Sequence, residues 1–306
     1  MKSRRRKFYP DSLQHVYQQS ADKGVIFYTD FDYLVFFTII CTVSLEYDVK
    51  LAAVVPMPDH LHELTVASHL EELALFHMHY PAVFALEYNR HYGRKGRLLK
   101  KSFGSAPKYG NKAIRTTLAY NYNNPTERKL CTRVEDWRWN FLAYANKPFP
   151  FSRPFNWNKA RSCMKRAVIE VKAIHKSRGY LNYAILERLF APLNADEREQ
   201  LKDLIIGIWS VIDYEYIISF YGDYETMLRA FNSNTGAEFD IKEEWGKYDD
   251  RVYSLMTDLL QADGIVDVPR QIYSMPEAVK RKLATRLIAK FPDANPKQVA
   301  KYLHLK

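Results

Sequence analysis

The chain has 306 residues, of which 47% are hydrophobic, and a formal net charge of +10 at pH 7. That apolar content is enough for one large or two ordinary packed domains, so it excludes an intrinsically disordered chain. The longest apolar run, residues 34–45, is shorter than the roughly 20 residues of a membrane span, and the basic start leads into polar residues rather than a secretory signal, so a cytoplasmic protein that spans no membrane is expected.

The predicted elements alternate between strands and helices. Residues 12–20 partly alternate like a strand, and residues 30–46 read as a buried helix. Residues 49–55 and 60–66 predict two strands joined by the turn PMPD. A long helix is expected over 69–92, with Pro81 as a candidate kink, followed by a basic loop. A further helix is expected over 111–123, ended by Pro125. This order predicts an α+β fold in which helices pack on an antiparallel sheet, with a split βαβ arrangement as one option.

The positive charge is concentrated in the first half of the chain. Residues 90–115 carry nine Lys or Arg and no Asp or Glu, with Tyr, Phe and Gly between them. Such a segment suits phosphates and stacked bases, although a solvated surface loop is the alternative. With the basic N-terminus, the candidate DNA-binding residues are Arg4, Arg5, Arg6, Arg90, Arg94, Lys95, Arg97, Lys100, Lys101, Lys108, Lys112 and Arg115.

Two histidines follow the predicted turn in the motif MPDHLH. Residues two apart on a strand share a face, so His60 and His62 are expected to project side by side, as two ligands of one metal ion would. Strand histidines are more often ordinary surface or core residues, which is the alternative. His77 and His79 have the same spacing inside a helical pattern, where they lie about 200° apart, so we interpret them as structural.

The stretch LAYNYNNP supplies a second group of candidates. On a helix, Tyr120 and Asn124 are four residues apart and share one face. The amide oxygen of Asn124 would complete a metal site begun by His60 and His62, and leave room for a phosphate oxygen beside Tyr120. The alternative is that tyrosine and asparagine are simply abundant and that NNP is a turn.

These features together resemble a known family, the single-tyrosine HUH transposases of bacterial insertion sequences, and among them the REP-associated tyrosine transposases. The resemblance covers about residues 4–146 and rests on six blocks in order: RRRKFYPDSLQHVYQQS, GVIFYTDFDYLVFF, MPDHLH, EYNRHYGRKGRLLKKSF, YNYNNP and VEDWRWNFLAY. The family usually has Asn at Asp59 and an apolar residue at Glu63. An arginine common after its first strand corresponds here to Gln18 or Gln19, and an aromatic residue frequent before its second basic patch is replaced within LLKKSF.

The resemblance implies a ferredoxin-like core and a function. His60, His62 and Asn124 would hold a divalent metal, magnesium or manganese, and Tyr120 would be the catalytic nucleophile that cuts and rejoins DNA through a 5′-phosphotyrosine. The implied partner is single-stranded DNA with a hairpin or palindromic repeat, bound by a monomer or a homodimer. The alternative is a domesticated protein that binds DNA or RNA hairpins without cutting them.

The second half of the chain predicts a helical accessory domain over 147–306, after an endonuclease domain over 1–146. Residues 159–175 and 195–231 read as helical, and Ser274 with Glu277 forms a predicted capping box. The end resembles the first helix of a helix-turn-helix, capped by Asn295, so a partial motif of this kind over 276–306 is an option beside simple helical packing.

Overall fold

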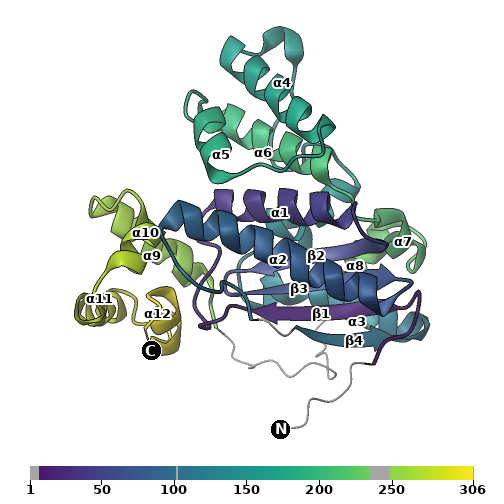
Figure 1. Cartoon of the computed structure of the whole chain (residues 1–306), viewed down its shortest axis with the longest axis horizontal. Helices are drawn as coiled ribbons and strands as arrows, with labels where there is room; N and C mark the ends of the chain where they lie inside the picture. The colour runs from purple at the N-terminus through teal and green to yellow at the C-terminus, as the bar shows by residue number, and fades with distance from the viewer. Residues whose placement is uncertain (1–6, 101–102, 234–247, 306) are drawn as a thin grey trace.

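The computed structural model describes residues 7–100, 103–233 and 248–305. Its first part is an α+β unit built on one four-stranded sheet, with helices on both faces (Figure 1). The elements of this part are β1 Leu13–Gln19, α1 Asp30–Ser44, β2 Val49–Met57, β3 His60–Ala67, α2 Leu70–Tyr92, β4 Gly104–Lys108 and α3 Gly110–Glu127.

The strands lie in the order β2-β3-β1-β4, and each neighbouring pair is antiparallel. This is the split βαβ arrangement, so the predicted fold class is confirmed. The register places Tyr17 opposite His62 and Gln19 opposite His60. The ends of β1 and β3 that carry the candidate residues are therefore held side by side by the sheet's own hydrogen bonds.

The two faces of the sheet bury different sets of side chains. Leu61 of β3 packs with residues of α1 and α2, whereas Leu64 packs with Leu118 and Tyr122 of α3. Because side chains alternate along a strand, His60 and His62 lie on the α3 face, and Glu63 lies on the α1 and α2 face.

The rest of the described chain is helical, as predicted. After four 3-10 helices, η1 Val134–Asp136, η2 Arg138–Asn140, η3 Leu142–Ala145 and η4 Trp157–Lys159, come α4 Ser162–Lys176, α5 Tyr183–Phe190, α6 Ala195–Trp209, α7 Tyr214–Ser219, α8 Tyr224–Ser233, α9 Arg251–Ala262, α10 Val268–Ser274, α11 Glu277–Lys290 and α12 Pro296–Tyr302. Figure 1 shows α4, α5 and α6 beyond α1, and α9 to α12 beside the sheet. No helix in the described ranges is both long and apolar enough to cross a membrane.

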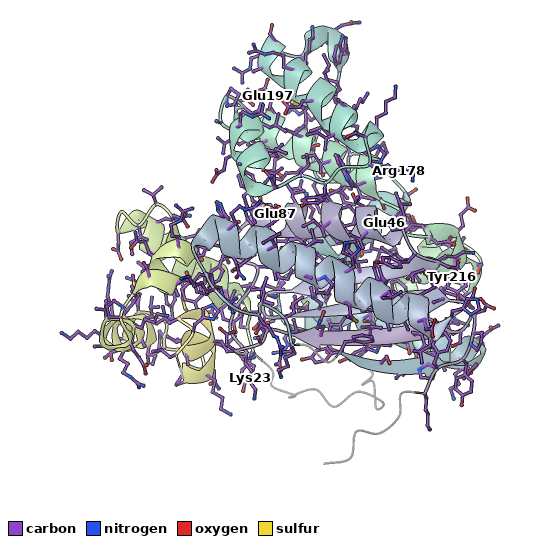
Figure 2. All side chains as sticks on the ribbon, viewed as in Figure 1. Lys23, Glu46, Glu87, Arg178, Glu197 and Tyr216 are labelled. Carbon is purple, nitrogen blue, oxygen red and sulfur yellow. The ribbon has the colours of Figure 1, made fainter. Side chains whose placement is uncertain are left out.

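Helix α1 is buried from Asp32 to Ser44 because it has neighbours on two sides. The sheet lies below it, and α5 and α6 cover it from above. The Thr38 hydroxyl accepts a hydrogen bond from the Leu181 amide (3.1 Å), and the Trp209 indole donates to Thr42 (3.2 Å). At the same junction Tyr180 donates to Glu87 of α2 (3.1 Å; Figure 2). The helices after residue 147 thus share one core with α1, while a domain boundary near residue 146 stays a prediction.

Several local predictions are wrong, for identifiable reasons. The segment predicted as a basic loop contains β4, which forms because it completes the edge of β1. Helix α3 continues through Pro125, since proline there removes one backbone hydrogen bond near the helix end. Pro81 likewise lies within an unbroken α2.

Two further corrections concern the helical region. The helix expected over 195–231 is three helices, because Asp213 caps α7 and Gly222 has a φ of 88° before α8. The capping box expected at Ser274 is absent among the described residues: Ser274 ends α10, its hydroxyl donates to the Gln271 carbonyl (3.0 Å), and α11 begins after Pro276. The cap at Asn295 is confirmed, with Gln298 completing a capping box.

Glu63 is a carboxyl group enclosed between β3 and α2. It accepts a hydrogen bond from the Tyr80 hydroxyl, and its other oxygen lies 3.3 Å from His77 Nδ1. Burial raises the pKa of Glu63 to about 8, against the lowering effect of the hydrogen bond from Tyr80. Glu63 is therefore protonated at neutral pH in the folded protein.

This raised pKa predicts a pH dependence of stability. A carboxyl group with a higher pKa in the folded state contributes stability that is fully present below its unfolded pKa and is lost as the pH rises through about 8. The loss is about 1.4 kcal/mol per pH unit for one group. We expect Glu63→Gln, which keeps an acceptor for Tyr80, to flatten the free energy of unfolding measured by urea titration between about pH 5 and about pH 8. Glu71→Gln, at an exposed position of α2, is the control and should retain the wild-type slope.

Candidate functional site

The predicted histidines and the predicted tyrosine meet on the α3 face of the sheet. The ring centroids of His60 and His62 lie 4.9 Å apart, and the Tyr120 ring centroid lies 6.2 Å from that of His62. The histidines come from β3 and the tyrosine from α3. Two segments far apart in the sequence thus place an imidazole pair and a phenol at one point.

Asn124 lies one helical turn beyond Tyr120. Its amide nitrogen donates to the Tyr120 carbonyl (3.2 Å), so the amide oxygen is the end of the group that remains to act as a ligand. Tyr120 is 1% exposed, and Asn124, His60 and His62 are also buried. A phosphate group would therefore reach these side chains only after a local opening of the site.

Tyr122 points away from this cluster, as expected two residues along a helix. Its ring stacks on Phe231 of α8 with centroids 5.1 Å apart, and its hydroxyl lies 3.5 Å from the Ala52 carbonyl. Burial raises the pKa of Tyr122 well above its usual value. Tyr122 is therefore a core residue, and of the two tyrosines Tyr120 faces the histidines.

Two residues of β1 belong to the cluster and were not singled out from the sequence. His15 Nε2 lies 3.1 Å from His62 Nδ1, and the ring centroid of Tyr17 lies 5.2 Å from that of His62 and 5.5 Å from that of His60. Alternation along LQHVYQQ places His15 and Tyr17 on one face, which is a usable signal. The pairing of β1 with β3, however, was needed to connect them with the motif MPDHLH.

Asp59 orients His60 and ties it to the C-terminal helix. The Asp59 carboxylate lies 2.6 Å from His60 Nδ1 and 2.5 Å from Lys301 Nζ of α12. Although burial raises the pKa of Asp59, His60 and Lys301 outweigh that effect and hold it well below its usual range. A carboxylate on one imidazole nitrogen leaves the other nitrogen oriented for a ligand, which is the usual arrangement at metal-binding histidines.

A second link joins the end of α3 to the start of α9. The Asp250 amide donates to the Arg128 carbonyl (3.0 Å), and Gln298 of α12 donates to the Asp250 carboxylate (3.0 Å). Burial, together with the nearby Asp59 charge, raises the pKa of Asp250 to about 6. Helices α9 and α12 therefore form an outer layer around the turn that carries His60.

The donor set fits a divalent cation. Burial and the neighbouring His60 and His15 lower the pKa of His62 well below its usual value, so this imidazole is neutral, the form that ligates metals. Within the described ranges no group of three or more His, Cys, Asp or Glu side chains is placed to hold a metal. A metal here would thus depend on His60, His62 and the Asn124 amide.

The predicted DNA-binding residues do not form one uniform surface. Arg4, Arg5, Arg6 and Lys101 lie outside the described residues. Lys95, Arg97, Lys112 and Arg115 are exposed, and Lys108 is buried. Arg94 is used internally, since its guanidinium donates to the Arg97 carbonyl (2.7 Å) and to Asn89 (3.0 Å). Arg90 lies 3.3 Å from Glu87.

Lys100 connects the basic segment to the candidate site. Its amide donates to the Gln19 carbonyl (2.9 Å), and its ammonium group donates to the Gln19 side chain. Because Gln19 is opposite His60 in the sheet, this basic residue lies at the end of β1 next to the histidine motif. The basic segment therefore starts its path across the molecule beside the cluster.

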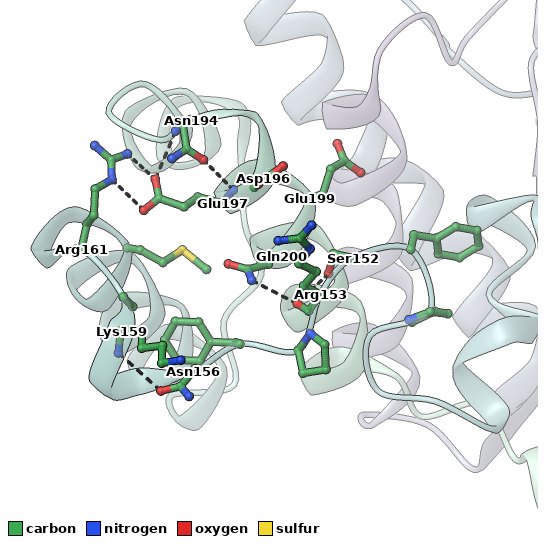
Figure 3. A pocket seen from close by; sticks show the side chains of 16 residues that line it. Ser152, Arg153, Asn156, Lys159, Arg161, Asn194, Asp196, Glu197, Glu199 and Gln200 are labelled. Carbon is green, nitrogen blue, oxygen red and sulfur yellow. Dashed lines mark hydrogen bonds and ion pairs between the residues drawn. The ribbon is translucent and has the colours of Figure 1, made fainter.

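A cavity of about 910 Å³ lies elsewhere, between the 150–161 segment, α4 and α6 (Figure 3). Its charged residues pair with neighbours: Arg161 donates to Glu197, and Glu199 accepts from Arg138 and Lys202. None of the predicted site residues lines it. The cavity is therefore separate from the cluster on the sheet.

Comparison with known proteins gives one structural similarity. No protein-family model and no curated protein matches the chain. Among solved structures, that of a REP-associated tyrosine transposase bound to a REP hairpin is similar, with 19% sequence identity over 45% of this chain and 80% of that chain, and a TM-score of 0.39. A similarity of this extent assigns neither a family nor a function to the chain.

The contact between Asp59 and His60 predicts an effect on metal affinity. Asp59→Ala removes the carboxylate that orients the imidazole, so the dissociation constant for Mn²⁺ should rise about 10- to 100-fold in calorimetric titrations. Lys301→Met, which leaves the Asp59 to His60 contact in place, should raise it less. Asp293→Ala, at an exposed site before α12, should bind as the wild type does. Equal affinities in all four proteins would contradict the assigned role of Asp59.

Proposed function

We propose that this protein is a metal-dependent endonuclease and strand transferase that acts on single-stranded DNA carrying a hairpin, with Tyr120 as the nucleophile. The observation that supports this proposal best is the meeting of Tyr120 with His60 and His62 from a different element. Neutral imidazoles next to a phenol are suited to phosphoryl transfer to tyrosine, and a basic segment begins beside them.

His60, His62 and Asn124 would hold the cation, magnesium or manganese, and Asp59 would orient the first of these ligands. When bound, such a cation polarises the phosphate and offsets the negative charge that develops on it. The chain's own contribution is to fix the ligands on β3 and α3 and to exclude water, since these side chains are buried.

The proposed step is an exchange of phosphodiester bonds. The Tyr120 hydroxyl oxygen forms a bond to the scissile phosphorus, and the bond from phosphorus to the 3′ oxygen breaks, which leaves a 5′-phosphotyrosine and a free 3′-hydroxyl. The phenolic proton is lost as the oxygen attacks, and the departing oxygen takes up a proton. Because the covalent link conserves the bond energy, a second 3′-hydroxyl can reverse the step without ATP.

The two tyrosines of YNYNNP provide the central test. Tyr120→Phe should abolish the covalent adduct with labelled single-stranded DNA on a denaturing gel, while DNA affinity stays nearly unchanged. Tyr122→Phe should still form the adduct, because Tyr122 packs in the core against Phe231. His60→Ala or His62→Ala should suppress the adduct, with partial recovery at raised manganese.

The opposite pattern, an adduct that is absent in Tyr122→Phe and present in Tyr120→Phe, would refute the assignment. Binding of hairpin DNA without an adduct in the wild-type protein would instead favour a non-cleaving hairpin-binding protein.

The exposed part of the basic segment predicts a salt dependence of DNA binding. Lys95→Gln with Arg97→Gln should reduce the slope of log affinity against log salt by roughly 0.7 for each single-strand phosphate that the protein no longer neutralises. Arg94 is left intact because its guanidinium holds the loop together. Lys172→Gln with Lys176→Gln, exposed on α4, is a control of equal charge change and should leave the slope as it is. A slope unchanged in both double variants would exclude residues 95–97 from the DNA path.

A further inference from the structure

A second cavity lies directly beside the turn that carries His60. Its volume is about 300 Å³, near the lower end for sites that hold small organic molecules. Pro58 of the turn lines it, as do Leu130 after α3 and Asp250 before α9. It is therefore bounded by the two chain segments that carry the histidines and the tyrosine.

Hydrogen bonds fix this cavity relative to the candidate site. The amides of Ile26 and Phe27 both donate to the Pro58 carbonyl, at 2.7 and 3.1 Å. On the other side, the Asp250 amide donates to the carbonyl of Arg128 at the end of α3. A ligand in the cavity would thus be held at a constant distance from His60 and Tyr120.

The wall of the cavity is aromatic. Tyr33 stacks on Trp139 with centroids 4.6 Å apart and on Phe27 at the same distance, and Trp137 meets the Tyr33 ring edge-on at 6.1 Å. Tyr253 of α9 also lines the cavity. The buried Nε1 donor of Trp137 has no acceptor within the part of the chain that the structure describes. Several flat rings and a polar group suit a flat, polar ligand.

The charges of the lining select the chemistry of that ligand. Two carboxylates, Asp30 and Asp250, line the cavity, which disfavours a phosphate inside it. Arg251 also lines it, but its guanidinium pairs with Asp249 (2.9 Å). Carboxylate oxygens accept hydrogen bonds from the exocyclic amino groups of nucleic-acid bases, and aromatic rings stack on their faces.

We propose that this cavity binds one unpaired base of the DNA strand, a base that bears an exocyclic amino group, next to the phosphate presented to Tyr120. The inference depends on the proposed function and adds a base-specific contact to it. The base enters the aromatic cavity while its phosphates stay outside along the basic residues. The cavity thereby sets the position of the strand relative to the histidines.

The test uses the full-length protein and single-stranded oligo(dA), oligo(dC) and oligo(dT) of equal length, with binding followed by fluorescence anisotropy. Adenine and cytosine carry an exocyclic amino group and thymine does not. Ser254 is exposed and lines the cavity, so Ser254→Trp fills it without touching the core. Leu255→Trp places the same side chain on the next residue of α9, which is 50% exposed and does not line the cavity.

We expect the wild type and Leu255→Trp to bind oligo(dA) and oligo(dC) about tenfold more tightly than oligo(dT). Ser254→Trp should lose this preference and keep its affinity for oligo(dT). Asp250→Asn should also reduce the preference, because its amide nitrogen is a donor. Equal affinity of the wild type for all three strands, or a preference that survives in Ser254→Trp, would overturn the inference alone. Absence of binding to all three strands would overturn the proposed function with it.

Discussion

The turn at Pro58 and Asp59 is the constraint on which the surroundings of the site depend. The Pro58 carbonyl accepts hydrogen bonds from the amides of Ile26 and Phe27, and the Asp59 carboxylate contacts both His60 and Lys301. Since Asp59 is buried, removing either partner would leave a charge without full compensation, which is costly in a protein interior. One short turn therefore fixes the orientation of an imidazole, the path of the 25–28 segment and the position of the C-terminal helix.

The sheet separates two kinds of chemistry through the alternation of its side chains. On the α3 face, His15, His60 and His62 gather around Tyr120. On the other face a single carboxyl group, Glu63, is enclosed with Tyr80, and its proton is retained because burial raises its pKa. A shift of one residue in the register of β3 would exchange these environments, so the hairpin between β2 and β3 specifies the site as much as the histidines do.

The sequence carried much of this arrangement, because its strongest signals are local. Alternation predicted the strands and the shared face of His60 and His62, and the four-residue spacing predicted that Tyr120 and Asn124 are neighbours on one helix. The contributions of His15, Asp250 and Lys301 could not be predicted, since they depend on strand pairing and on helix packing over long separations in the chain. Arg94 shows the opposite error, because a guanidinium in a basic run can be used to hold its own loop rather than to meet a phosphate.

Helix α1 is enclosed by the sheet on one side and by α5 and α6 on the other, with the Tyr183 hydroxyl reaching Asp32 (2.7 Å). A gene shortened after residue 146 would therefore encode an N-terminal part whose most apolar helix faces water. Such a product would be expected to associate with itself or to be degraded. The two halves of this protein are thus expected to be inherited together, and an exchange of the second half between relatives would succeed only if residues such as Leu181 and Trp209 still matched the surface of α1.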